Sequence, residues 1–448
     1  MPRFKFVNLK GDLFATGLST AGQSAIKLIS SLILTRILRP DAYGIITILM
    51  SMIFIVGMLS DIGISVSIVR DKNAEAPNYL NTAWTLRLCR AFLNGAIIFL
   101  SAPIIASLYD LPTLTEPLRI FSLWFIIDGF ESTSFPIAIR RKNSRIIMYS
   151  ELAATVVSTV FTIVYCYFSR DYWGMVYGAL LNRLVLILLS HCYYRELRPR
   201  LQLDWVVARE MSRYTRYVMP SSVITLLLSQ YDKAALLRFF DLRLLGVYGL
   251  AANIAAPVES LISKVSQMVL YPRCAQDFRD NPDTFSLKYY TGNTKLFIGI
   301  LALPAAIGGA AHLLVTVLYD PRYAQAGAIL QAFMLRAVLL SLASPAEDML
   351  IASGEARVVL IGNLFRAFWI VIASLIGMHF FGFIGFAYGI ALSGVPPLLY
   401  YFWVQHRKGF LRFRYEIYKV VFTSAVAIVA HLTSSFLEKI SHTAHLRI

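Results

Sequence analysis

The sequence predicts an all-α polytopic membrane protein. We expect two six-helix transmembrane lobes related by pseudo-two-fold symmetry around a central cationic cavity, with an extra C-terminal helix. Thirteen apolar stretches occupy nearly all of the 448 residues, and a stretch of ~20 apolar residues crosses a bilayer core of ~30 Å. Hydrophobic residues make up 57% of the chain, and the mean hydropathy is +0.62. The longest polar linker falls near the middle of the chain, after the sixth stretch.

The expected membrane helices follow one another with short outer connections. We place them near residues 13–35, 44–69, 87–108, 118–139, 147–168, 173–193, 215–238, 246–271, 290–318, 326–351, 357–380, 384–405 and 417–437. Domain boundaries fall in exposed polar segments, so the linker 195–216 is expected to separate an N-terminal lobe, 1–194, from a C-terminal lobe, 217–406. Residues 407–448 are expected to form a basic cytoplasmic loop and the thirteenth helix, the least apolar of the set.

The distribution of basic residues predicts the orientation of the chain. With a cytoplasmic N-terminus, the cytoplasmic segments hold 24 Lys and Arg residues and the outer segments hold 8. Lys and Arg collect in the cytoplasmic loops of membrane proteins, so this is the orientation we expect. The same bias explains the net charge of +16. We therefore expect the lipid bilayer as a partner and no nucleic acid.

The two halves of the chain show weak self-similarity. The first span is followed by Tyr43-Gly44 and the seventh by Tyr248-Gly249. Lys27 precedes the first pair by sixteen residues, and Lys233 precedes the second by fifteen. Six spans per half leave both halves in the same orientation, so a repeat of this kind has its axis along the membrane normal.

Charges within the spans suggest where a ligand binds. A charge at the centre of a membrane helix costs about 2.5–3.5 kcal/mol on insertion scales, so it must pair, face water or reach an interface. Charges near span ends are expected to reach the interface: Arg87, Arg90, Arg119, Glu151, Lys295, Glu347 and Asp348. Six deeper cations are distributed over six helices: Lys27, Arg183, Lys233, Lys264, Arg336 and Arg366. Acids are fewer at that depth, which predicts a wet cationic cavity whose ligand is an anion such as phosphate.

Three acids are candidates for binding a coupling ion. Asp128 and Glu131 lie three residues apart on one helical face of the fourth expected span. They are either partners for a nearby arginine or part of a coupling-ion site, and both interpretations stay open. Asp61, in Ser-Asp-Ile-Gly near the end of the second span, is a further candidate and is equally consistent with helix packing.

No pattern for covalent chemistry is present in the sequence. The seven histidines show no metal-binding spacing, and no nucleophile-elbow motif occurs. The four cysteines form no CxxC pair. Gly385 and Gly389 lie in an apolar helix, where small residues indicate close helix packing. We therefore expect no catalytic residues, no metal and no cofactor.

The chain resembles the bacterial flippases that export polysaccharides or lipid-linked oligosaccharides. These belong to the multidrug/oligosaccharidyl-lipid/polysaccharide exporter superfamily. The resemblance rests on four segments: Leu34-Thr-Arg-Ile-Leu-Arg-Pro-Asp-Ala-Tyr-Gly44, Leu59-Ser-Asp-Ile-Gly-Ile64, Leu245-Gly-Val-Tyr-Gly-Leu-Ala-Ala252 with Ala256-Pro257, and Leu270-Tyr-Pro-Arg-Cys-Ala275.

The resemblance implies transfer of an undecaprenyl-diphosphate-linked glycan across the bacterial inner membrane by alternating access between two lobes. It also implies a polysaccharide polymerase and export machinery as partners. Two alternatives remain. One is a multidrug or other lipid-precursor exporter of the same fold. The other is a membrane-embedded enzyme that polymerises or modifies the glycan.

Overall fold

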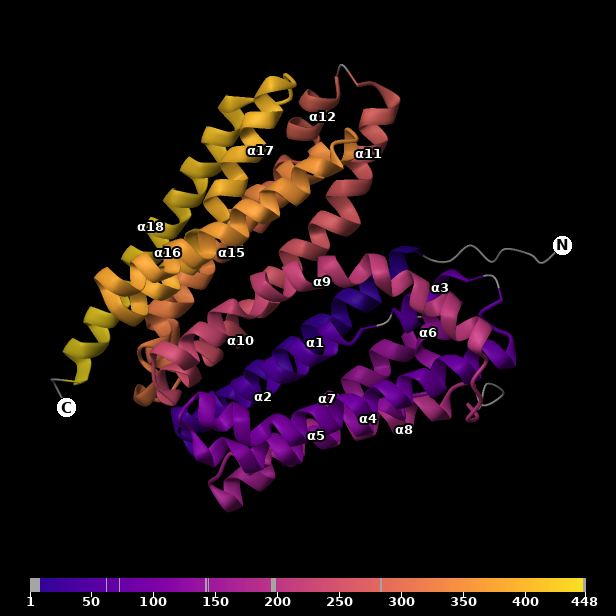
Figure 1. Ribbon diagram of the computed structural model, residues 1–448. Coiled ribbons are helices and arrows are strands. Elements are labelled where there is room, and N and C mark those ends of the chain that lie inside the picture. The colour runs from indigo at the N-terminus through magenta and orange to yellow at the C-terminus, as the bar shows by residue number, and fades with distance from the viewer. Residues whose placement is uncertain are drawn as a thin grey trace. The chain divides into compact units, whose positions relative to one another are not determined.

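The computed structural model describes residues 9–61, 63–71, 73–141, 143, 145–194, 199–282 and 284–445. Within these ranges the regular structure is helical, without strands. The chain divides into two compact units, Met1–Arg243 and Leu244–Ile448. Figure 1 shows both units as bundles of long helices with short connections.

The first unit is built from nine helices of the described chain. They are α1 (Leu9–Ile37), α2 (Pro40–Leu59), α3 (Ile64–Arg70), α4 (Pro77–Leu108), α5 (Thr115–Gly129), α6 (Ser134–Arg140), α7 (Arg145–Ser169), α8 (Trp173–Cys192) and α9 (Trp205–Phe239). Within the unit, α4 packs on α5, α5 and α7 pack on α8, and α1 packs on α7. Pro40 and Pro77 occupy the first turns of α2 and α4, where a missing N–H costs no hydrogen bond.

Two expected spans of this unit are interrupted, which corrects the continuous helices expected at 44–69 and 118–139. The first break follows α2. Gly63 there has a φ of 67°, and its N–H donates to the Asp61 carboxylate at 2.9 Å. The second break follows α5, where the Ser132 N–H donates to the Ser190 hydroxyl at 3.0 Å. Side chains thus replace the helical partners of the backbone, which makes each break stable inside the bundle.

The short helices after the two breaks, α3 and α6, pack against each other. Arg140, at the end of α6, connects them. Its guanidinium donates to the carbonyl oxygens of Ile68 at 3.0 Å and Val69 at 3.2 Å, and also to that of Asp71. These carbonyls lie at the end of α3, where no intrahelical donor is left for them.

The expected linker differs from the structure. Helix α9 begins at Trp205, inside the segment 195–216, because the Asp204 carboxylate accepts the N–H of Val206 at 2.9 Å. Residues 195–198 lie outside the described part of the chain. Since α9 packs on α2 and α4, the helix expected to open the second lobe lies in the first unit, and the boundary falls at Arg243.

The second unit contains the remaining helices. They are α10 (Leu242–Val265), a π-helical turn (Ser266–Leu270), α11 (Tyr271–Asp280), α12 (Phe285–Gly292), α13 (Thr294–Gly309), α14 (Ala311–Leu318), α15 (Ala326–Ala352), α16 (Ala356–Ala391), α17 (Val395–Arg407) and α18 (Phe413–His445). The expected span 246–271 therefore ends in the π-helical turn. The expected span 290–318 consists of several helices, with a bend of 53° between α12 and α13.

Helix α16 contains a reversal of the chain. Gly382 has non-helical angles, φ 60° and ψ −140°, and a Cβ on Gly389 would meet the backbone of Ala373. In a straight helix, residues sixteen apart would be ~24 Å from each other, so the chain folds back at Gly382. This confirms the turn expected between residues 380 and 384 and the close packing expected at Gly385 and Gly389.

The C-terminal helix α18 packs on α13 and α14. A Cβ on Gly309 would collide with the Ala427 carbonyl and lie 2.7 Å from the Ala430 methyl. The Ser434 hydroxyl donates to the Gly309 carbonyl oxygen at 3.3 Å. The least apolar of the expected spans is therefore an integral part of the second unit.

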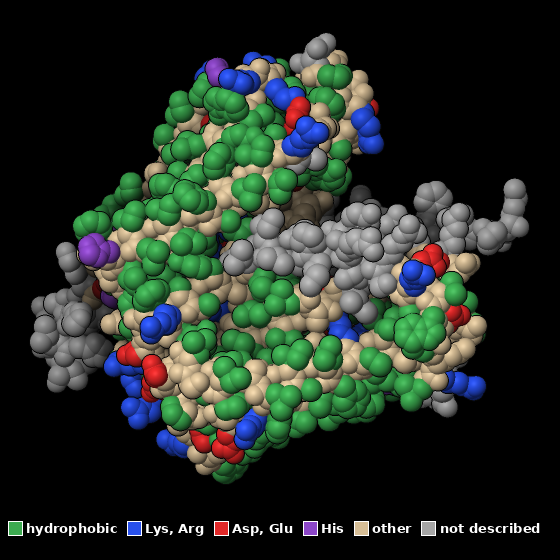
Figure 2. Space-filling view, in the orientation of Figure 1, with side chains coloured by type: hydrophobic (Ala, Val, Ile, Leu, Met, Phe, Trp, Pro, Cys, Tyr) green, Lys and Arg blue, Asp and Glu red, His purple; other side chains and the backbone are tan. Residues whose placement is uncertain are grey.

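The helices have the length and the surface of a multi-pass membrane protein. Eight helical stretches of the described chain are long and apolar enough to cross a membrane, or nine if the bent α12–α13 pair is one span. One of the eight, Arg357–Arg407, contains the reversal at Gly382. The number is below thirteen partly because breaks shorten some stretches, leaving α5 with 15 residues. Figure 2 shows apolar side chains covering much of the visible surface. Phe168 of α7 is an example of an exposed apolar side chain, at 80% exposure.

Candidate functional site

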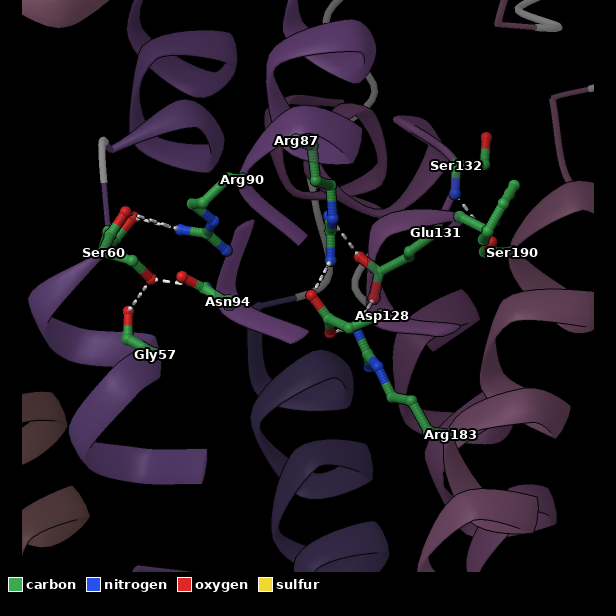
Figure 3. Close-up of polar contacts among 12 residues, drawn as sticks. Gly57, Ser60, Arg87, Arg90, Asn94, Asp128, Glu131, Ser132, Arg183 and Ser190 are labelled. Atoms are coloured by element: carbon green, nitrogen blue, oxygen red, sulfur yellow. Dashed lines mark hydrogen bonds and ion pairs between the residues drawn. The ribbon is translucent and has the colours of Figure 1, made fainter. Parts of the chain in front are cut away.

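Four largely buried charged side chains meet where α4, α5 and α8 pack together (Figure 3). The Arg87 guanidinium lies 2.9 Å from the Glu131 carboxylate and 3.6 Å from that of Asp128. Arg183 of α8 is paired with both of these carboxylates. The four side chains are between 9% and 15% exposed. We call Arg87, Asp128, Glu131 and Arg183 the charge quartet.

Close helix packing explains why the quartet forms. A Cβ on Gly129 would collide with the Ala91 methyl and lie 3.5 Å from Leu88, so only glycine lets the end of α5 approach α4 this closely. The approach brings both carboxylates to Arg87. Helix α5 ends at Gly129, and Glu131 extends from the following break toward α8. Buried charges are stable only when they are paired in this way.

A second group of polar contacts connects α4 to the break after α2. The Arg90 guanidinium lies 3.3 Å from the Asp61 carboxylate, and the Asn94 amide donates to the Ser60 hydroxyl at 2.8 Å. Arg87, Arg90 and Asn94 lie on one face of α4 because they are three and four residues apart. Asp61 is 52% exposed, unlike the carboxylates of the quartet.

A pocket of about 190 Å³ lies beside the quartet. It is lined by Ile53, Gly57, Arg87, Arg90, Ala91, Asn94, Trp124, Phe125 and Asp128. The Nε atoms of Arg87 and Arg90 are buried and have no hydrogen-bond partner among the residues that the structure describes. We call this the α4–α5 pocket. It combines arginine side chains with an aromatic wall.

The six predicted cavity cations have different environments. Arg183 belongs to the quartet, and Arg336 binds the Glu259 carboxylate through two hydrogen bonds of 2.9 and 3.0 Å. The Lys233 ammonium donates to the Gln230 side chain at 3.1 Å. Lys27 is exposed, and Lys264 and Arg366 are partly buried. Arg183 and Arg336 are thus bonded to carboxylates, and the role of all six cations in binding an anion stays a prediction.

The expectation that Arg87, Arg90 and Asp348 reach an interface is wrong. Arg87 is 14% exposed and Arg90 is 22% exposed, and each has a carboxylate partner across a helix boundary. Asp348 is 8% exposed and accepts a hydrogen bond from Ser266. These residues lie near the ends of their expected spans, which favoured an interfacial position. The residues that they contact belong to other segments, which the sequence does not show. The spacing of Asp128 and Glu131 was the one signal of the quartet in the sequence.

A further buried ion pair, absent from the sequence-based candidates, lies in the second unit. Lys419 and Glu416 of α18 are 6% and 7% exposed, with their charged atoms 2.8 Å apart. The Lys419 ammonium also lies 4.1 Å from the ring centre of Phe297 and 5.0 Å from that of Tyr290. The sequence placed Lys419 at the start of the last expected span, 417–437, and only the packing of α18 on α13 shows that it is buried.

Two features outside the site bear on its chemistry. Among the described residues, no group of His, Cys, Asp or Glu side chains is arranged to hold a metal ion. The four cysteines are free, and burial raises the pKa of the Cys274 thiol in α11.

Residues 33–327 match the family described as polysaccharide biosynthesis proteins. The chain belongs to this family. Two relatives illustrate its range. The lipopolysaccharide biosynthesis protein WzxC of Escherichia coli (strain K12) is 23% identical over 381 residues, which are 84% of this chain and 76% of WzxC. The succinoglycan biosynthesis transport protein ExoT of Rhizobium meliloti (strain 1021) is 21% identical over 59% of this chain and 53% of ExoT.

Two solved structures show the fold of this family member. The lipid II flippase MurJ, in an inward closed conformation, matches 95% of this chain and 99% of its own, with a TM-score of 0.70 at 12% identity. An inward-facing multidrug resistance transporter of the MATE family, from the MOP superfamily, matches 86% and 94%, with a TM-score of 0.61 at 16% identity. The all-helical fold class is confirmed by these structures, and the predicted family is confirmed by the family match. Both solved neighbours are transport proteins.

Proposed function

We propose that this protein is a flippase that moves an undecaprenyl-diphosphate-linked oligosaccharide across the bacterial inner membrane by alternating access. The observation that carries the proposal is the likeness of nearly the whole fold to the lipid II flippase MurJ. Membership of the polysaccharide biosynthesis family supports a glycan as the transported group. The protein binds and releases its substrate without making or breaking a covalent bond.

The diphosphate is proposed to bind the predicted cations, which are Lys27, Arg183, Lys233, Lys264, Arg336 and Arg366. Lys27 is the strongest candidate because its side chain is exposed and accessible to a ligand. Arg183 and Arg336 are the weakest, because a diphosphate would have to displace the carboxylates to which they are bonded.

The coupling ion is proposed to bind at an acid of the first unit, and Asp61 is a better candidate than Asp128 or Glu131. Asp61 is half exposed and pairs with Arg90. The other two acids are buried, and each contacts both arginines of the quartet. A cation would therefore reach Asp61 with less competition.

A deletion strain tests the proposed function. Loss of the gene should abolish a surface glycan while its lipid-linked unit, fully assembled, accumulates on the inner leaflet, measured by mass spectrometry of extracted lipids. Expression of the intact chain should restore export. An incomplete sugar unit in the pool would instead identify a synthetic or modifying enzyme. A normal glycan together with sensitivity to toxic cations would identify a multidrug exporter.

The proposed transport step requires other proteins that act on its product. A polysaccharide polymerase must join the translocated units on the outer side, and export machinery must carry the polymer to the surface. We propose both as functional partners of this flippase.

A further inference from the structure

We infer that the α4–α5 pocket is a binding subsite for an uncharged sugar residue of the transported glycan, separate from the site that holds the diphosphate. The inference rests on the proposed function, because it names the part of that substrate which the first unit recognises. The evidence comes from the charge balance, the polar side chains and the walls of the pocket.

The charges around the pocket cancel. Three arginines, Arg87, Arg90 and Arg183, face three carboxylates, those of Asp61, Asp128 and Glu131, and every one of the six has an opposite charge within 4 Å. An anion would therefore have to compete with carboxylates already held at these arginines. Without a net charge to attract diphosphate or an acidic sugar, the pocket favours a neutral polar ligand.

The polar groups that line the pocket suit a sugar. Arg87 and Arg90 line it with guanidinium groups, whose N–H groups only donate hydrogen bonds. The Asp128 carboxylate beside them only accepts hydrogen bonds. A sugar hydroxyl both accepts and donates, so neighbouring hydroxyls on one ring can satisfy an arginine and a carboxylate together.

The walls complete a sugar-binding arrangement. Trp124 and Phe125 line the pocket, and their rings meet edge to face at 5.5 Å. Trp124 lies one helical turn before Asp128 on the same face of α5, so an apolar surface adjoins the polar atoms. The C–H face of a sugar ring packs on such an aromatic surface while its hydroxyls reach the polar side.

Gly57 provides a direct test. It lines the pocket, and a Cβ at this position would have no heavy atom within 4 Å. The variant Gly57→Leu should therefore fill the pocket from α2 without disturbing the packing of the unit. Gly299 in α13 of the second unit also has no atom within 4 Å of a Cβ, so Gly299→Leu is the matched control. Trp124→Leu removes the aromatic wall independently.

The experiment measures binding to the purified full-length protein in detergent. The probes are the repeat-unit oligosaccharide released by mild acid from the lipid-linked pool of the host, and inorganic pyrophosphate. By isothermal titration calorimetry, the oligosaccharide should bind the wild type and Gly299→Leu equally. Gly57→Leu and Trp124→Leu should each weaken its binding at least tenfold, with melting temperatures close to the wild type. Pyrophosphate should neither compete with the oligosaccharide nor respond to Gly57→Leu.

Three results would overturn the sugar subsite. These are equal oligosaccharide affinity in Gly57→Leu and the wild type, no oligosaccharide binding by the wild type, and displacement of the oligosaccharide by pyrophosphate. If Gly57→Leu fails to fold, the comparison of Trp124→Leu with the wild type decides. The proposed function fails on a different observation, a lipid-linked pool unchanged by deletion of the gene, so the two failures are distinguishable.

Discussion

At the scale of single residues, buried arginines are balanced by carboxylates from neighbouring helices. Arg183 contacts two acids of the quartet, and Arg336 makes a two-pronged contact with Glu259. Removing one partner of a buried pair leaves a charge without compensation, which costs about 3–5 kcal/mol. These arginines therefore contribute to stability, whatever part they also take in binding a substrate.

Neutralising Arg183 should consequently reduce the amount of folded protein. Arg183→Gln leaves Asp128 and Glu131 with one arginine, and we expect a large loss of the monodisperse peak in detergent and a lower melting temperature. Adding Glu131→Gln removes one of the two competing charges and should recover part of the stability. The control is Lys27→Gln, because Lys27 is exposed. Wild-type stability of Arg183→Gln would show that the quartet is not required for the fold.

A second residue-scale prediction concerns Glu75, in the connection before α4. Its carboxylate lies 2.7 Å from the Arg141 guanidinium, whose hydrogen bond lowers the pKa of Glu75 below its ordinary value of 4.5. A carboxylate with a lowered pKa stabilises the fold above the ordinary value and loses this contribution as the pH falls through the lowered one. The pair is exposed, so the contribution is below about 1 kcal/mol.

Glu75→Gln should therefore lower the melting temperature slightly and by a constant amount between pH 6 and pH 8. Below pH 4.5 the difference from the wild type should shrink, because both side chains become neutral. Differential scanning fluorimetry across this range measures the effect. Gln substitution of Glu151, which accepts a hydrogen bond from Gln23 rather than from an arginine, is the control. A difference that grew toward acid pH would contradict the ion pair.

At the scale of helices, glycines and polar side chains decide where the apolar stretches bend. Gly63 and the Asp61 carboxylate end one span before its apolar pattern ends, and Gly382 turns α16 back on itself. In the returning segment, the backbone at Gly385 comes so close to Gly377 that neither position has room for a Cβ. The reversal depends on this close approach.

Gly385→Ala should destabilise the protein by about 1–3 kcal/mol, because the added methyl forces two backbones apart. Gly299→Ala is the matched control. Its Cβ meets no atom within 4 Å, and alanine is favoured over glycine in a helix by up to about 1 kcal/mol. Thermal unfolding in detergent should thus show opposite signs for the two variants. Equal melting temperatures would mean that the contact at Gly385 adjusts without cost.

At the scale of the whole molecule, the prediction that remains to be measured is the orientation in the membrane. The charge bias of the loops predicts that the N-terminus lies in the cytoplasm. In a variant without the four native cysteines, single cysteines at Asn143 and Arg200 should resist an impermeant thiol reagent in intact cells, and those at Asp110 and Asp320 should react. Labelling of Asn143 and Arg200 from outside would reverse the orientation.

The sequence by itself determined the membrane class, the positions of the apolar stretches and the family. These follow from composition, hydrophobic length and short contiguous segments, which are properties of the local chain. The turn at Gly382 and the tight packing at Gly385 could also be predicted from the local chain. Small residues in an apolar helix let another backbone approach closely.

Only the tertiary structure decided which charges are paired. Arg87 and Glu131 are far apart in the chain, and their contact depends on how closely Gly129 lets α5 approach α4. The depth of a residue along its own span says nothing about the neighbouring helix, so the sequence placed Arg87 at the interface and did not indicate that Lys419 is buried. The breaks after α2 and α5, the start of α9 and the α4–α5 pocket likewise arise from contacts between segments distant in sequence. Hydrophobic periodicity does not encode such contacts. It reflects whether each residue prefers an apolar or a polar environment, and it does not show which residues come into contact.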